Sequence, residues 1–505
     1  MSSPQGAVDA AFLELPLRRL ADASLQRARD FSVDHVDFRL ERIRTQRLTL
    51  RDAQLQGAAD GEELGFAVRV IVDGTWGFAS SVVLSAEEAV RVTEEAVRVA
   101  QVSAPMNTER IQLAPEPTYA DGRWVSAYDI DPLSVPTQEK VALLAEWSRG
   151  LLAADSVQHV SASVSQVLEN KFYVDASGTQ TTQQRVRLHP ALEAHGIDEA
   201  SGRLDSMRTL APPVGRGWEY LTGTGWDWPA ELAALPGHLA AKLSAASVEP
   251  GSYDLVIDPS NLWLTIHESI GHATELDRAL GYEANYAGTS FATVDKLGSL
   301  RYGSGHLHVV GDRTTEHGLA SIGYDDEGVQ AQQWEIISDG VLVGYQLDRR
   351  MAHLRGLPRS NGCAYADSPS HIPIQRMSNV SVRPDPDGPT TEQLIAGVED
   401  GIYVVGDRSW SIDMQRYNFQ FTGQRFFRIR SGRLAEPLRD VAYQATTTDF
   451  WGSMDAVGGP STWVLGGAFN CGKAQPGQVA PVSHGCPAAV FRDIRILNTA
   501  AESGR

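Results

Sequence analysis

The segment His267-Glu268-Ser269-Ile270-Gly271-His272 constrains this chain more than any other stretch of its sequence. It brings together two imidazoles and a carboxylate, the side chains of a zinc site that carries its own general base. In the common helical motif H-E-x-x-H, a spacing of four residues puts both histidines on one helix face. Here the spacing is five, and in a regular α-helix the two rings would point roughly 140° apart.

A local π-turn would resolve this conflict, because hydrogen bonds from residue i to residue i+5 return both histidines to one face. Gly271 is the residue that would tolerate such a distortion. The sequence therefore predicts a distorted helix at 267–272 if both histidines bind one metal ion. The alternative is that two histidines of a partly buried helix are each satisfied by ordinary hydrogen bonds. The six residues alone leave both interpretations open.

Length and composition limit the class of protein. A chain of 505 residues is expected to form two or more domains. Its formal net charge of −19 disfavours nucleic acid and anionic membrane as partners. We find no apolar run of transmembrane length, and acidic residues at 9 and 14 interrupt the apolar N-terminal stretch, unlike a signal peptide. The three cysteines are too few and odd in number for a disulfide framework, so we expect a cytoplasmic protein.

Hydrophobic periodicity predicts an α+β fold. Helical spacing or helix-start signals occur at 17–30, 85–100, from 137 onward and at 229–246, whereas residues 36–41 alternate as a strand does. Residues 66–72 lead through Asp73-Gly74, a strong hairpin signal, to a return strand at 76–81. Beyond residue 300 the chain consists mostly of short β-runs separated by glycine turns.

Pro250-Gly251 marks a predicted boundary just before a short buried strand at 253–257 and the helix that carries the histidine pair. We therefore predict an N-terminal sheet-and-helix domain at 1–248. A larger β-rich domain at 249–505 would follow it and would carry the metal-binding helix.

Catalytic zinc needs a third protein ligand and one open position. Strand histidines are more often exposed or hydrogen-bonded than metal-bound, and carboxylates that continue a helix are expected to cap or solvate it. Glycines flank Cys471, and the nearby Lys473 would favour its thiolate. Each cysteine could instead be a small buried hydrophobic residue, so spacing alone does not select the ligand. The candidates are Cys363, Cys471, Cys486, Glu275, Asp277 and the pair His306/His308.

Three motifs in this order make the chain resemble the TldD/PmbA metallopeptidases: H-E-S-I-G-H at 267–272, I-Q-R-M-S-N at 374–379 and Cys471-Gly472-Lys473. The N-terminal alternation that ends in Gly77-Phe78-Ala79 is also similar to that family's first domain. The resemblance is closer to the metal-bearing TldD side than to the PmbA (TldE) side, whose members lack H-E-x-x-x-H. Gly362-Cys363-Ala364 departs from the more polar or basic residues expected there.

The resemblance implies a Zn²⁺ site of His267, His272 and Cys471, with Glu268 as the catalytic base that activates metal-bound water. It also implies hydrolysis of peptide bonds in extended, unfolded or modified peptides, and a dimer with a TldE/PmbA-like paralogue or with itself. A β-rich domain could bind an extended peptide by adding it to a sheet edge. Two other functions stay open: a non-catalytic peptide-binding or assembly subunit, and a zinc hydrolase of a non-peptide amide.

Overall fold

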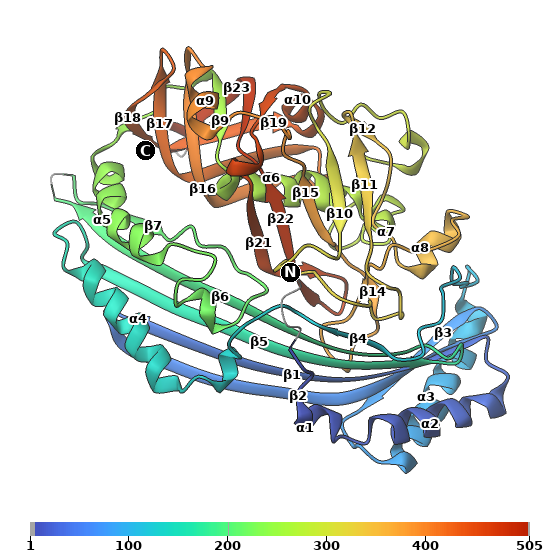
Figure 1. Cartoon of the computed structure of the whole chain (residues 1–505). Coiled ribbons are helices and arrows are strands. Elements are labelled where there is room, and N and C mark those ends of the chain that lie inside the picture. The colour runs from blue at the N-terminus through green and yellow to red at the C-terminus, as the bar shows by residue number, and fades with distance from the viewer. Residues whose placement is uncertain (1–5, 200, 503–505) are drawn as a thin grey trace.

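The structure, a computed structural model, describes residues 6–199 and 201–502. Within them, the first half of the chain forms a long, curved seven-stranded sheet with the order β3-β2-β1-β5-β6-β4, and β7 beside β6. The second half lies against the concave side of this sheet (Figure 1). The strands are β1 His35–Arg51, β2 Gln54–Val72, β3 Thr75–Ser81, β4 Gly122–Val125, β5 His159–Asp175, β6 Gln180–Asp198 and β7 Arg203–Arg208.

The alternation noted in the sequence gives this sheet two different faces. Phe38 and Phe66 belong to an apolar core with the helices α2 (Leu17–Ala28) and α3 (Ala86–Ser103). Residues that alternate with them, such as Arg39 and Arg69, are equally buried but make contacts with the second half of the chain. The predicted hairpin is confirmed: Val72 pairs with Thr75, and Asp73 and Gly74 both have positive φ, as a type I′ turn requires.

Helices cover both ends of the sheet, and the predicted helices are confirmed within a few residues. Ser85 caps α3 by accepting a hydrogen bond from the Glu88 N–H at 3.2 Å, but the Glu88 carboxylate binds Ser81 instead of closing a capping box. The helices of the first half are α1 Ala10–Leu13, α2 Leu17–Ala28, α3 Ala86–Ser103, α4 Thr137–Leu152 and α5 Trp228–Ser244.

The second half is built on an eight-stranded sheet with the order β16-β9-β23-β19-β17-β18-β8, and β20 beside β23. Smaller sheets, β12-β11-β10-β15, β13-β14 and β21-β22, stand beside it. These strands are β8 Ala246–Ser247, β9 Gly251–Ile257, β10 Val309–Asp312, β11 Gln333–Ser338, β12 Val341–Leu342, β13 Ala364–Tyr365, β14 Ile374–Gln375, β15 Asn379–Val382, β16 Asp400–Ile412, β17 Asn418–Arg430, β18 Arg433–Arg439, β19 Val441–Thr446, β20 Met454–Val457, β21 Val464–Lys473, β22 Gln478–Cys486 and β23 Ala489–Asn498.

Short helices complete the second half. They are α6 Pro259–Ile266, α7 Leu276–Ala279, α8 Arg349–Leu354, α9 Thr391–Ala396, α10 Thr447–Gly452 and α11 Thr499–Glu502. The division of the chain into domains 1–248 and 249–505 stays a proposal, because β8, just before the boundary, already pairs with β18. Among the described residues, no helix combines the length and the apolar character needed to cross a bilayer.

Buried charges join the two halves. Lys171 of β5 lies 2.7 Å from the Asp326 carboxylate, and Arg69 of β2 lies 2.9 Å from Glu327 and 2.7 Å from Asp37. We call this set the ionic layer. Its members are Asp37, Glu41, Arg69, Glu169, Lys171, Arg185 and Arg187 from the sheet, and Asp326 and Glu327 from the second half.

Candidate metal centre

The helix that carries the histidine pair begins as a regular α-helix and then distorts. The Asp258 side chain caps α6 by accepting the Ser260 N–H at 3.0 Å, with Pro259 in the first turn. A π-turn follows at His267–Gly271, in which the N–H of His272 donates to the carbonyl of His267. The predicted departure from a regular α-helix is therefore confirmed, and the hydrogen bond spans the five residues that separate the histidines.

This turn brings the two imidazoles together. Their ring centroids are 4.7 Å apart. One ligand atom each from His267, His272 and Cys471 lie within 4.8 Å of one another, and these residues are only 5%, 5% and 4% exposed. Among the described residues, these three form the one group of histidine, cysteine or acidic side chains with metal-binding geometry.

Gly271 has a different role from the predicted one. Its φ of −53° is ordinary helical backbone that any residue adopts. A Cβ atom here would lie 2.6 Å from the Met377 sulfur, which is too close. Met377 therefore packs directly against the turn and leaves little room for a side chain at Gly271, whereas the backbone distortion itself does not need glycine.

A second histidine orients His267. His267 Nδ1 lies 2.7 Å from His484 Nε2, and His484 Nδ1 lies 2.8 Å from the Val380 carbonyl oxygen. Burial holds the pKa of His484 well below its usual value, so this ring is neutral. Because the carbonyl only accepts, His484 Nδ1 carries the hydrogen and its Nε2 accepts from His267. The Nε2 lone pair of His267 is consequently left available for a metal ion.

A carboxylate orients His272 in the same way. Glu275 Oε2 lies 2.9 Å from His272 Nδ1, and Glu275 Oε1 lies 3.0 Å from Lys473 Nζ. Burial raises the pKa of Glu275, but Lys473 and His272 outweigh it, so its pKa lies well below the usual value. The carboxylate therefore accepts the Nδ1 hydrogen, and His272 Nε2 faces Cys471 Sγ at 3.5 Å.

The expectation that Glu275 and Asp277 cap or solvate the helix is wrong. Both are buried, and Lys473 Nζ lies 2.8 Å from an Asp277 oxygen. The helical run through the π-turn ends at Thr274, and Glu275 has extended backbone, so its carboxylate reaches back to His272.

Cys471 lies on β21, whose pairing with β22 is irregular between Ala468 and Cys471. Burial raises the pKa of the Cys471 thiol, but His272 and Arg376 outweigh this effect and lower it. Lys473, expected to be the cation that favours the thiolate, binds Glu275 and Asp277 instead. The thiolate is thus favoured by different neighbours from those that the sequence suggested.

The other candidate ligands lie outside this group. The Cys363 thiol is 3.3 Å from the Asn361 side-chain oxygen, and burial raises its pKa to about 12. Burial also raises the pKa of Cys486 well above its usual value. His306 is exposed, and His308 lies on the surface, 3.6 Å from Asp339.

Glu268 is buried next to the group and is bound by Arg416, a residue that no sequence pattern singles out. Arg416 Nη1 lies 2.6 Å from Glu268 Oε2, and Arg416 Nη2 donates to the Ala287 carbonyl at 3.1 Å. Arg416 lies in the loop between β16 and β17 with a φ of 64°, and its own carbonyl accepts from the Thr447 hydroxyl at 2.8 Å. No spacing or motif in the sequence connects residues so far apart.

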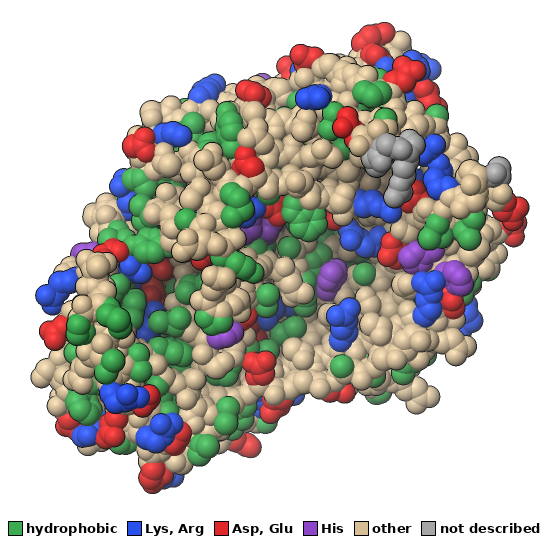
Figure 2. All heavy atoms as spheres, turned by 180° about the vertical axis from the view of Figure 1, so that it is seen from behind, with side chains coloured by type: hydrophobic (Ala, Val, Ile, Leu, Met, Phe, Trp, Pro, Cys, Tyr) green, Lys and Arg blue, Asp and Glu red, His purple; other side chains and the backbone are tan. Residues whose placement is uncertain are grey.

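The group opens onto a cavity of about 530 Å³ between the two halves of the chain. Its walls include Glu268 and Arg416, the aromatic side chains of Trp226, Trp263 and Phe469, and most of β21. Within the described residues β21 pairs only with β22. Seen from behind, the molecule is hollowed between its halves, and hydrophobic side chains gather in the hollow (Figure 2).

Comparison with known families agrees with this architecture. Residues 250–498 match the PmbA/TldA metallopeptidase C-terminal domain, and residues 36–100 match the PmbA/TldA metallopeptidase domain 1. Together the two matches span more than half of the chain. The chain belongs to the PmbA/TldD family of metallopeptidases, and the resemblance inferred from its motifs is confirmed.

Relatives of similar length carry related names. A metalloprotease from Methanothermobacter thermautotrophicus is 29% identical over 92% of this chain and 96% of its own length. A zinc metalloprotease TldD homolog from Saccharolobus solfataricus is 21% identical over 94% of this chain and 98% of its own length.

Solved structures share the fold, which is α+β as predicted. TldE from Thermococcus kodakarensis superposes with a TM-score of 0.69 at 16% identity, covering 94% of this chain and 99% of its own. A putative modulator of DNA gyrase from Thermotoga maritima gives a TM-score of 0.76 at 15% identity, covering 95% and 100%.

Proposed function

We propose that this protein is a zinc-dependent peptidase whose metal ligands are His267, His272 and Cys471. The observation that carries the proposal is the convergence of three buried ligand atoms whose surroundings favour the forms that bind metal. Burial lowers the pKa of both histidines and so favours neutral imidazoles, and the pKa of Cys471 is also lowered. Two neutral imidazoles and a thiolate are a donor set that zinc accepts. A zinc ion there would polarise a carbonyl group and make a water molecule more acidic.

Glu268 is the proposed general base. It is 5% exposed, directly follows one proposed ligand in the chain and lines the same cavity. Its carboxylate would take a proton from the attacking water and pass it to the leaving amine. The hydrogen bond from Arg416 fixes the orientation of this carboxylate and leaves its other oxygen for the proton transfer.

The proposed substrate is an extended segment of an unfolded or modified peptide. Among the described residues, no strand pairs with the edge of β21 that does not face β22, and residues 466–472 line the cavity. A peptide added to this edge would be read mainly through its backbone. Trp226, Trp263 and Phe469 offer apolar surface to its side chains.

We also propose a dimer with a TldE-like paralogue or with a second copy of this chain, which the structural similarity to a TldE protein supports. A cytoplasmic location is proposed as well. The three cysteines are all free and buried, as expected in a reducing compartment.

Metal analysis combined with a cleavage assay tests the proposed function. The purified protein, alone and with any chain that copurifies, should contain about one zinc per chain and should cleave an unfolded protein such as reduced casein. A chelator should abolish cleavage, and added zinc should restore it. A metal-free protein that binds peptides would indicate a binding subunit. A zinc protein that hydrolyses only non-peptide amides would indicate the other alternative.

A further inference from the structure

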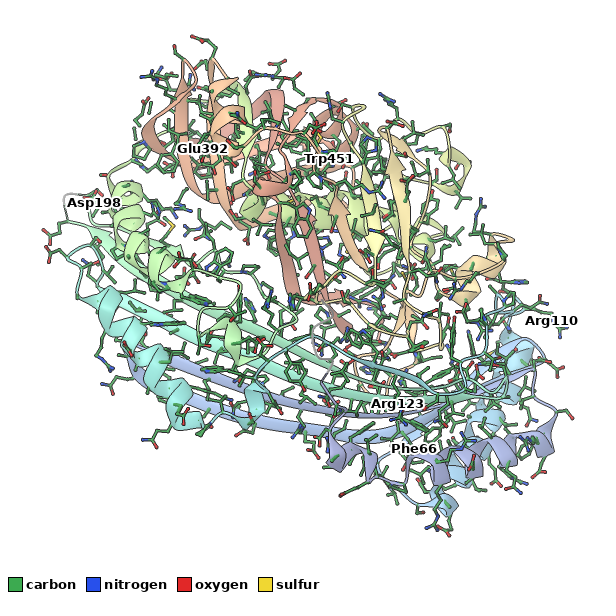
Figure 3. All side chains as sticks on the ribbon, viewed as in Figure 1. Phe66, Arg110, Arg123, Asp198, Glu392 and Trp451 are labelled. Atoms are coloured by element: carbon green, nitrogen blue, oxygen red, sulfur yellow. The ribbon has the colours of Figure 1, made fainter. Side chains whose placement is uncertain are left out.

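A second cavity, of about 460 Å³, lies between the two halves and shares no lining residue with the cavity at the metal centre. One wall is β4 and the neighbouring part of β6, and the other is the chain that follows β10. Arg123, labelled in Figure 3, marks β4, and the residues that follow it line this cavity. Its polar lining includes Ser126, Arg185, Arg313, Thr315 and His317.

Arg313 is the unusual member of this lining. It is 2% exposed, and within the described part of the chain its guanidinium has no hydrogen-bond or ion-pair partner. The comparably buried Arg69 is ion-paired with both Asp37 and Glu327. An uncompensated buried charge is costly unless something pairs with it.

Arg185 adds a second cation to the same cavity. Its Nη2 lies 2.8 Å from Glu169 and its Nη1 donates to the Leu319 carbonyl at 3.2 Å, but its Nε has no partner among the residues that the structure describes. The Ser126 oxygen accepts the Val186 N–H at 2.9 Å, and its own hydroxyl hydrogen is free to donate. Two guanidinium groups and a hydroxyl donor therefore share one cavity.

In the described part of the chain, the nearby acidic groups make no direct contact with the Arg313 guanidinium. The Asp325 carboxyl accepts the backbone N–H of Val329 at 2.9 Å and that of Ala364 at 3.0 Å. Asp326 binds Lys171 at 2.7 Å. The Glu316 side chain is mostly exposed and lies 3.6 Å from His317. Asp325 and Asp326 favour the charge of Arg313 from a distance, but among the described residues none of these carboxyl groups forms an ion pair with its guanidinium.

We propose that this cavity binds an oxyanion group, a carboxylate or a phosphate carried by a small molecule or a peptide, with Arg313 as its main anchor. A guanidinium presents parallel N–H donors that match both groups in a two-point contact. Because Arg185 and Ser126 come from the first half and Arg313 from the second, the bound group would hold the two halves together. This proposal does not depend on the function proposed for the metal centre.

Thermal unfolding of the full-length protein tests the site. Inorganic phosphate and, separately, acetate would be titrated against chloride at equal ionic strength. In the wild type we expect a saturable rise in Tm of about 2 °C for at least one oxyanion, since a ligand that binds only the folded state stabilises it. In Arg313→Met the rise should be lost, apart from any contribution of phosphate at the metal centre. Phosphate can also act on the metal centre, but the variant keeps that centre, so such an effect would appear equally in both proteins.

The matched control is Arg98→Met, which removes an exposed arginine paired with Glu95 and should keep the full response. Without oxyanion, Arg313→Met should be at least as stable as the wild type, because it loses an unpaired buried charge. If that variant does not fold, Arg313→Lys replaces it, and we expect the apparent affinity of this variant for the oxyanion to fall about five-fold or more.

Equal responses in the wild type and the Arg313 variant, or no response of the wild type to either oxyanion, would overturn the proposal. The anion that gives the response identifies the group recognised.

Discussion

The candidate metal centre and the ionic layer both bury polar side chains, but their charged and polar groups are paired in different ways. In the ionic layer each charge faces an opposite charge, as Lys171 faces Asp326 at 2.7 Å. At the metal centre the outer nitrogens of the imidazoles are hydrogen-bonded to His484 and Glu275, whereas their inner nitrogens converge on the Cys471 sulfur. Burial of polar groups alone therefore does not indicate a functional site. What distinguishes the candidate metal centre is that its three ligand atoms converge on one another.

The largest effect that would test this difference is expected from Cys471→Ala. Removing one of three converging ligand atoms should abolish zinc binding, and peptide cleavage should fall to background with it. The measurements are zinc content by mass spectrometry and cleavage of an unfolded protein at saturating substrate.

Cys363→Ala and Cys486→Ala are the matched controls, because their thiols are equally buried but lie outside the group. Both should keep about one zinc per chain. Full zinc content in Cys471→Ala, together with loss of zinc in either control, would show that the ligand is assigned to the wrong cysteine.

Glu268→Gln should separate catalysis from metal binding at the same site. The amide keeps an oxygen that can accept from Arg416 but cannot take a proton, so turnover should fall about 10²–10⁴-fold. Zinc should remain near one per chain. A folded, zinc-free Glu268→Gln protein would mean that this carboxylate is a ligand and not the base.

Lys171→Met tests the ionic layer, where a substitution should change stability and leave zinc binding intact. It leaves Asp326 and Glu41 buried without their lysine, and breaking such a pair typically costs about 3–5 kcal/mol of stability. Zinc affinity should not change, because Lys171 belongs to the sheet and makes no contact with the metal group. Chemical denaturation and zinc titration measure the two quantities, and a parallel loss of both would show that the regions are coupled.

His484→Phe should weaken zinc binding without removing a ligand. The variant loses the acceptor that holds His267 in the required tautomer, and such changes typically cost about 10–100-fold in metal affinity. Competition with a chelator measures this affinity, and His308→Phe, at the surface, is the control. Unchanged affinity would mean that the π-turn alone orients His267.

The sequence predicted the parts of this molecule that depend on local spacing. The alternation at 36–41 indicated a strand, and the five-residue interval between His267 and His272 indicated the π-turn. The sequence does not reveal that the polar face of that strand is buried. Apolar and charged residues alternate in the same way whether water or another part of the chain covers the polar face. The hairpin of β21 and β22 was also not predicted, since its glycines weaken the strand signal.

The partners that orient the site were missed for a related reason. His484 and Arg416 reach the π-turn from elements far away in the chain, so no local pattern connects them with it. Glu275 is close in sequence, but the sequence predicts a helix that continues through it, with the carboxylate capping or solvating that helix. Only the end of the helical run at Thr274 turns its carboxylate inward.

Asp348 provides the smallest expected effect, a change in how stability depends on pH. Its carboxyl caps α8 by accepting the Met351 N–H at 2.7 Å. Burial and the neighbouring Glu327 and Asp277 raise its pKa from an ordinary 3.8 to about 7, against the opposing effect of the Met351 N–H and Arg350. A raised pKa of an acid means that the folded state binds the proton more tightly. The resulting stabilisation is complete below about pH 4 and is lost as the pH rises to about 7.

Asp348→Asn should remove this dependence, because asparagine caps a helix about as well as aspartate but cannot ionise. The variant should match the wild type near pH 4 and exceed its stability at pH 8. Histidines such as His189 and His238, whose pKa values burial lowers to about 4, act in the opposite direction but are the same in both proteins. Urea denaturation at several pH values measures the difference in stability between the wild type and Asp348→Asn. A chelator is present so that metal loss does not contribute. If the difference in stability between the two proteins stays constant from pH 4 to pH 8, Asp348 is already ionised throughout this range. Its neighbours would then compensate its charge as fully as Asp326 compensates the charge of Lys171.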